Sequence, residues 1–196
     1  YSTALNHIVQ RDDILFGHSL GNNSLVNRTG TQTALLAVNL TDSDRNLAPS
    51  PAATVWFNAS ANTYINVTLG SNATNSSGNA SFFFNPDCRF SVGYQNWTGF
   101  VNSTEACYQT AMVYPLNLTV MGDFVYNVTA PSGQEFVAGN VTNISVEIQS
   151  DCGQLLTDIP TTSLWFELRG PNNVTICGSQ NITNLNNGTY VCTFNT

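Results

Sequence analysis

The sequence predicts an all-β protein built as two tandem β-sandwiches, and three observations lead to this prediction. Short runs rich in β-branched and aromatic residues recur through the 196 residues, with turn-forming residues between them. No window has the apolar stripe that marks an amphipathic helix. Several short segments recur at an offset of about 107 to 110 residues, which indicates an internal duplication.

The first half of the chain contains five clear strand candidates before residue 101. Residues 34–40 and 54–57 are apolar runs, residues 63–69 are rich in β-branched side chains, and residues 80–84 and 90–100 are rich in aromatic side chains. Turn-forming residues separate these runs at a spacing of roughly 8–15 residues, which is typical of immunoglobulin-like sandwiches.

Five further strand candidates follow. Residues 112–120 and 143–148 alternate apolar with polar side chains, so that alternate residues share one face of a strand. Residues 124–128, 163–168 and 189–194 combine aromatic and β-branched side chains. We therefore expect two tandem immunoglobulin-like β-sandwiches.

The duplication fixes the expected domain boundaries. Val55–Phe57 matches Leu164–Phe166, and Gly78–Asn85 matches Gly188–Asn195. Shorter matches join Val38–Leu40 to Val146–Ile148 and Tyr1–Leu5 to Tyr108–Met112. The expected parts are an N-terminal extension, residues 1–12, a first domain, residues 13–120, and a second domain, residues 121–196.

By the offset, Thr196 corresponds to Pro86, so we expect the second sandwich to lack its last strand. A sandwich without that strand exposes an apolar groove and unpaired backbone groups. Residues 1–12 of another copy are one candidate to fill the groove, because they align with the start of residues 112–120. Alternatively, the chain is a window from a longer array whose missing strand lies beyond Thr196, or residues 1–12 are a frayed terminus. The candidate donor-strand residues are Ala4, Leu5, Ile8 and Val9.

The surface is expected to be covered by glycans. Charged residues make up only 9% of the chain, lysine is absent and the net charge is −7, which argues against binding to nucleic acid. No apolar run is long enough to predict a membrane-spanning segment. Asn-x-Ser/Thr sequons are enriched about threefold over chance. The expected glycosylation sites are Asn22, Asn27, Asn39, Asn58, Asn66, Asn72, Asn75, Asn79, Asn96, Asn102, Asn117, Asn127, Asn140, Asn143, Asn173, Asn181 and Asn187.

The five cysteines favour an oxidising, extracellular location. Cys88 and Cys107 are the only cysteines of the first domain, and we expect them to pair. The second domain has three, for which Cys177–Cys192 is the favoured pairing and Cys152–Cys192 the alternative. The remaining thiol is a candidate for a bond between subunits.

The sequence gives little support for an enzyme or a cofactor. The two histidines, His7 and His18, both lie near the N-terminus, so neither sandwich contains an imidazole base. No metal-binding spacing accompanies the cysteines. Asp42, Asp44 and Asn46 resemble the start of a calcium loop, but a polar turn is the favoured interpretation. We expect no catalytic residues, no metal site and no cofactor.

The tryptophans have two interpretations. Trp56, Trp97 and Trp165 would suit a platform for binding sugars. Trp56 and Trp165 occupy equivalent positions of the repeat inside predicted strands, so a place in the core is favoured.

The order of these features resembles bacterial-type immunoglobulin-like repeats of surface glycoproteins. The resemblance rests on an apolar strand followed by the polar turn 41–46, on Val55–Phe57, on Gly78–Phe84 and on the strand-entry turn Asn187–Tyr190. A glycan-rich chain with an open last domain and an N-terminal strand also resembles subunits of archaeal threads and similar fibres joined by donor strands. This resemblance implies an extracellular filament of head-to-tail copies.

The sequence therefore predicts a structural subunit of an extracellular glycoprotein filament that polymerises with copies of itself. The alternative is a cell-surface adhesin, an S-layer protein or a receptor ectodomain, present as a fragment of a longer immunoglobulin-like repeat protein. Residues 146–172 form the longest other stretch without a sequon and are a second candidate contact surface.

Overall fold

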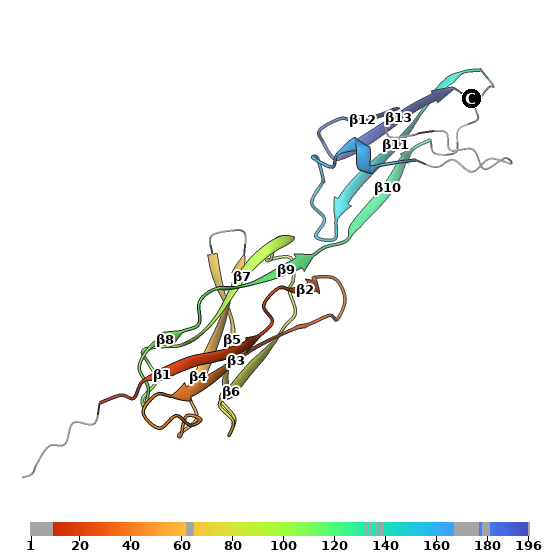
Figure 1. Ribbon diagram of the computed structural model, residues 1–196. Helices are drawn as coiled ribbons and strands as arrows, with labels where there is room; N and C mark the ends of the chain where they lie inside the picture. The colour runs from red at the N-terminus through yellow and green to blue at the C-terminus, as the bar shows by residue number, and fades with distance from the viewer. Residues whose placement is uncertain are drawn as a thin grey trace, which may run out of the picture. The chain divides into compact units, whose positions relative to one another are not determined.

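The computed structural model describes residues 10–61, 65–131, 133, 135, 137, 139–166, 177 and 181–195. These residues form several β-sheets and no α-helix, so the protein is all-β as predicted (Figure 1). The chain divides into two compact units, unit 1 (Tyr1–Met121) and unit 2 (Gly122–Thr196). The predicted boundary after residue 120 lies next to this division.

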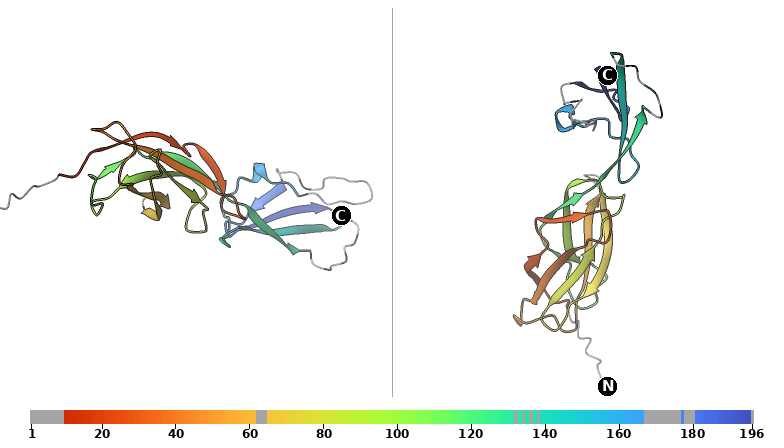
Figure 2. Two further views of the ribbon diagram at one scale, coloured as in Figure 1. Left: turned by 90° about the horizontal axis from the view of Figure 1, so that it is seen from below. Right: turned by 90° about the vertical axis from the view of Figure 1, so that its right-hand side faces the viewer.

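Unit 1 contains two sheets (Figure 2). The three-stranded sheet has the antiparallel order β1-β3-β6, formed by β1 (Ile14–Leu20), β3 (Ala34–Asp42) and β6 (Asn79–Phe84). The larger sheet has the order β2-β9-β7-β4-β5, with β8 beside β7, and its only parallel pair among the described residues is β2 with β9. Its strands are β2 (Ser24–Asn27), β4 (Thr54–Ala61), β5 (Ile65–Ala73), β7 (Gly93–Val101), β8 (Ala111–Met112) and β9 (Leu116–Met121).

The core of unit 1 lies between these sheets. Alternate residues of β3, among them Leu36 and Leu40, are buried because successive side chains of a strand point to opposite faces. The larger sheet contributes Phe57, Trp97 and Leu118, which are also buried. The rings of Phe57 and Trp97 stack with their centroids 6.4 Å apart.

Unit 2 has one described sheet, with the order β10-β11-β13-β12. Its strands are β10 (Phe124–Ala130), β11 (Val141–Ser150), β12 (Ile182–Asn184) and β13 (Thr189–Asn195). Residues 156–166, which include the short 3-10 helix η1 (Thr161–Ser163), pack on one face of this sheet.

The duplication is visible in the structure. The order β1-β3-β6 of unit 1 recurs as β10-β11-β13 in unit 2. The Leu40 N–H donates to the Gly78 carbonyl at 2.8 Å, and the Ile148 N–H donates to the Gly188 carbonyl at 2.9 Å. Both glycines have a positive φ, 77° and 84°, which explains why glycine occurs at this position of both repeats.

Several predicted elements differ from the observed ones. The expected strand 112–120 is two strands, because Pro115, which has no N–H to donate, lies between β8 and β9. The expected strand 163–168 begins in η1, and of its described residues, 163–166, only Phe166 forms a bridge, to Cys177. The described part of unit 2 has no counterpart of β7, β8 or β9, which all follow Pro86 in unit 1. None of the described helical residues forms a helix long and apolar enough to cross a membrane.

Candidate functional site: an apolar groove in unit 2

An apolar groove of about 650 Å³ lies between the sheet of unit 2 and residues 163–166. None of the described residues that line the groove is charged. It is lined by Phe124, Tyr126, Val128, Pro131, Ile144, Val146, Ile148, Ser163, Leu164, Trp165 and Phe166.

One wall of the groove is β10, whose alternate residues Phe124, Tyr126 and Val128 point into it. Their side chains are 63%, 66% and 51% exposed. Ile14, at the equivalent first position of β1 in unit 1, is only 6% exposed and belongs to the core. The same position of the repeat is therefore covered in unit 1 and open in unit 2.

The base of the groove is the inner face of β11, formed by Ile144, Val146 and Ile148. In unit 1 the equivalent strand β3 is covered by the larger sheet. Val38, the counterpart of Val146, lies so close to β7 that a Cβ on Gly99 would be 3.2 Å from its Cγ1 atom. The described part of unit 2 has no such strand over Val146.

The opposite wall is irregular and is held to the sheet by Tyr190. The Tyr190 hydroxyl donates to the Leu156 carbonyl at 3.0 Å and accepts a hydrogen bond from the Ile159 N–H at 3.0 Å. A disulfide between Cys177 and Cys192 attaches a second point of the chain to β13. The Leu156 N–H also donates to the Ile148 carbonyl at 3.0 Å, and the Asn184 Nδ2 atom donates to the Thr157 carbonyl at 2.7 Å. Together these links keep the wall in place.

Trp165 extends this wall and is 72% exposed. The prediction that Trp56 and Trp165 belong to the core is therefore wrong. Trp56 is half-buried because its neighbours Val55 and Phe57 point inward, and Trp97 is the tryptophan of the unit 1 core. The repeat preserved the position of the tryptophan without preserving its environment.

Two sequon asparagines of unit 2 lie on the face of the sheet opposite the groove. Asn127 follows Tyr126 on β10, and Asn143 precedes Ile144 on β11, so alternation places both on the opposite face of the sheet. Of the other expected sites, Asn27, Asn39, Asn58 and Asn102 are half-buried, and Asn173 lies outside the described residues. The remaining described sites are exposed: Asn22, Asn66, Asn72, Asn75, Asn79, Asn96, Asn117, Asn140, Asn181 and Asn187.

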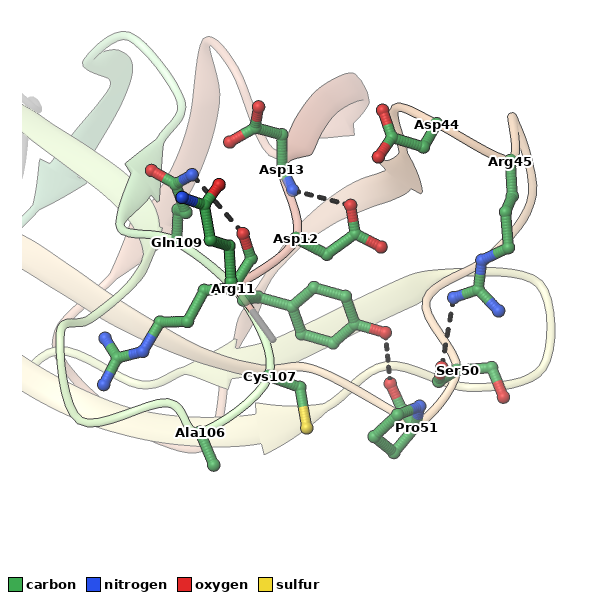
Figure 3. Close-up of a pocket in the computed structure, with 12 residues that line it drawn as sticks. Arg11, Asp12, Asp13, Asp44, Arg45, Ser50, Pro51, Ala106, Cys107 and Gln109 are labelled. Carbon is green, nitrogen blue, oxygen red and sulfur yellow. Dashed lines mark hydrogen bonds between the residues drawn. The ribbon is translucent and has the colours of Figure 1, made fainter. Parts of the chain in front are cut away.

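The expected donor residues Ala4, Leu5, Ile8 and Val9 also lie outside the described residues, which begin at Gln10. Figure 3 shows the residues that follow, where the Gln109 side chain donates to the Arg11 carbonyl at 3.4 Å. Asp12 forms a parallel bridge with Tyr108. The Asp12 N–H donates to the Cys107 carbonyl at 2.9 Å, and the Gln109 N–H donates to the Asp12 carbonyl at 2.8 Å. The chain that follows the expected donor segment is therefore fixed to unit 1.

The polar turn after β3 is held by its own charges. Asp42 is completely buried, and the Arg45 Nε donates to its Oδ2 atom at 2.7 Å. Hydrogen bonds from Arg45 hold the pKa of Asp42 below its usual range, whereas burial and the nearby Asp42 carboxylate raise the pKa of Asp12. Among the described residues, no group of three or more His, Cys, Asp or Glu side chains is placed to hold a metal ion.

The expected pairing of Cys88 with Cys107 is wrong. Cys107 is an exposed free thiol, whereas Cys88 and Cys152 are each disulfide-bonded. The odd thiol is therefore Cys107 and not a cysteine of unit 2. The favoured pair Cys177–Cys192 is present, with an S–S distance of 2.01 Å. The spacing of cysteines in the sequence does not determine which of them pair, and here the two cysteines of unit 1 do not pair with each other.

No family model matches the chain, and no curated protein matches it either.

Proposed function

We propose that the chain is a structural subunit of an extracellular glycoprotein filament, with two immunoglobulin-like sandwiches. In this proposal the N-terminal extension, residues 1–12, of one copy fills the groove of unit 2 in the next copy through residues 1–9, while Asp12 stays bonded to its own unit 1. The open apolar groove is the observation that carries the proposal, because burying each large apolar side chain contributes about 1.5–3 kcal/mol. Strand addition of this kind is head-to-tail, so it produces a filament rather than a closed dimer.

The chemistry of residues 1–12 suits the groove. Residues 1–10 contain no Asp, Glu, Lys or Arg, and none of the described residues that line the groove is charged. At about 3.3 Å per residue, the nine residues before Gln10 extend over about 30 Å, more than the roughly 23 Å occupied by the seven residues of β10. Leu5 and Val9 lie on the same side of an extended strand, and so do Ala4 and Ile8, so either face offers apolar side chains.

The pattern of sequons supports the same proposal. Glycans attached at Asn127 and Asn143 would stand on the face of the sheet that is opposite the groove. Residues 1–12 contain no sequon either. Both partners of the proposed contact would thus remain free of sugar on a chain that is otherwise densely modified.

A second candidate function is an adhesin, S-layer or receptor ectodomain within a longer immunoglobulin-like repeat protein. One observation favours it: in unit 1 the equivalent inner face is covered by β7 and β9, which follow β6 in the same chain. By analogy, the groove of unit 2 would be filled by chain that follows β13.

The two proposals are separated by electron microscopy of the full chain and of a variant in which Gly-Ser residues replace residues 1–9. This replacement leaves Asp12 and its backbone contacts in place. If strand donation is correct, the full chain forms filaments and the variant remains monomeric. Filaments that persist in the variant would overturn the proposal.

A matched pair of substitutions on β10 tests the groove itself. Tyr126→Lys places a charge in the groove, and Val125→Lys places one on the opposite face of the same strand. The two side chains are similarly exposed, at 66% and 61%, so both variants should fold. Tyr126→Lys should abolish filaments and Val125→Lys should not. Equal loss in both variants would show that the groove is not the contact.

A further inference from the structure

Two sequon asparagines face each other in the three-stranded sheet of unit 1. Asn39 of β3 lies directly opposite Asn79 of β6. The Asn39 Nδ2 atom donates to the Asn79 Oδ1 atom at 2.9 Å and to the Ser77 carbonyl at 3.0 Å. Asn39 is half-buried and uses both hydrogens of its amide, whereas Asn79 is exposed. Within the described chain, the side-chain Nδ2 atom of Asn79 donates no hydrogen bond.

N-glycosylation consumes one of these amide hydrogens. The bond between the sugar C1 atom and the phosphate of a lipid-linked oligosaccharide pyrophosphate breaks, and the lipid pyrophosphate leaves with the electron pair. C1 forms a new bond to Nδ2, and the displaced proton passes to a base of the transferase. A glycan on Asn39 therefore removes one of its two hydrogen bonds, whereas a glycan on Asn79 leaves the Oδ1 atom that accepts from Asn39 in place.

We infer that these two sequons carry a single glycan, attached to Asn79. Asn39 stays unmodified because both hydrogens of its Nδ2 atom are used in hydrogen bonds. The limited space around Asn39 also supports this inference. Directly opposed residues have their Cβ atoms only about 5 Å apart, which leaves no room for two sugar rings. On the other side of Asn39, a Cβ on Gly17 of β1 would lie 3.4 Å from the Asn39 Oδ1 atom. The inference rests on the proposed function, because it requires that the chain is a substrate of an N-glycosylation system.

The larger sheet offers an internal comparison. Asn96 of β7 lies directly opposite Asn117 of β9, and both are exposed sequon asparagines. Neither side-chain Nδ2 atom of this pair donates a hydrogen bond within the part of the chain that the structure describes. Each molecule should therefore carry one glycan at this pair as well, but some molecules should carry it on Asn96 and others on Asn117.

The test measures the occupancy of each sequon by mass spectrometry of the protein from its native source. Enzymatic deglycosylation in ¹⁸O-water converts each glycosylated Asn into a heavy-oxygen Asp, which marks the site. We expect Asn79 to be labelled and Asn39 to be unlabelled in the same molecules. Molecules labelled at either Asn96 or Asn117, but not at both, are expected for the comparison pair.

Two variants separate the hydrogen bond from the sugar. Ser81→Ala destroys the Asn79 sequon but keeps the Asn79 side chain that accepts from Asn39. Asn79→Ala removes both. Occupancy of Asn39 should stay near zero in Ser81→Ala and rise several-fold in Asn79→Ala.

The outcomes distinguish this inference from the proposed function. A glycan on Asn39 in the native protein or in Ser81→Ala overturns the inference and leaves the glycoprotein filament standing. A protein without sugar at any sequon overturns the glycoprotein part of the proposed function together with the inference.

Discussion

Replacing Tyr190 with phenylalanine should loosen the wall of the groove while leaving the core of unit 2 filled. Tyr190 is completely buried, and its hydroxyl is the link between β13 and the irregular residues 156–159. Phenylalanine keeps the ring and removes only the oxygen. The Leu156 carbonyl then loses its donor, and the Ile159 N–H loses its acceptor.

The expected cost follows from these two contacts. A neutral hydrogen bond contributes a net 0.5–1.5 kcal/mol, roughly, so two of them contribute about 2 kcal/mol to the free energy of holding the wall. Since about 1.4 kcal/mol corresponds to a tenfold change in an equilibrium constant, the wall should open about 30-fold more often.

Amide hydrogen exchange at Ile159 measures this opening directly, because that N–H is the group that loses its acceptor. We expect its protection to fall about 30-fold in Tyr190→Phe. Tyr108→Phe is the control: Tyr108 is also buried, but its hydroxyl donates to the Pro51 carbonyl in unit 1. If the exchange rate of the Ile159 amide is unchanged in Tyr190→Phe, the Tyr190 hydroxyl does not hold the wall of the groove in place.

Three other predictions concern unit 1. Gly78→Ala should destabilise it by more than 2 kcal/mol, roughly, in urea unfolding, because a Cβ there would lie 2.2 Å from the Leu40 carbonyl oxygen at a φ of 77°. Asp42→Asn should lower the stability at pH 7, since it removes the carboxylate charge that pairs with Arg45. Because the pKa of Asp42 is lowered in the folded protein, the stabilisation that it provides is present above about pH 4 and is lost as the pH falls further, so variant and wild type should converge in acid. Cys107 should react with a maleimide under non-reducing conditions and add one label to the native protein; no label, or several, would contradict the cysteine states described above.

The sequence was most informative where alternation and duplication act together. Together they predicted the central part of β11, and alternation alone predicted residues 116–120 of β9, because strict alternation leaves one assignment of inward and outward side chains. The match of Gly78 with Gly188 correctly indicated a shared turn, because a positive φ with no space for a Cβ admits few residues other than glycine.

The parts that depended on distant contacts could not be predicted. Trp165 stands in a strand-like run that repeats that of Trp56, yet its exposure depends on whether another strand covers it. The pairing of cysteines depends on which loops approach each other, and Cys88 and Cys107 illustrate that closeness in sequence is a poor guide. The groove was inferred from the absence of a repeat segment, but the residues that line it became known only from the position of residues 163–166.

The position of β10 has a consequence for the solubility of unit 2. β10 is at the end of the order β10-β11-β13-β12, and all but its last residue are exposed. It contains no charged residue, whereas sheet edges in soluble proteins commonly carry lysine or proline to prevent edge-to-edge aggregation. Asn127 stands at the middle of this strand, and a sugar there would serve as the gatekeeper that charge supplies elsewhere. Chains lacking that sugar should form amorphous aggregates before they form any ordered assembly.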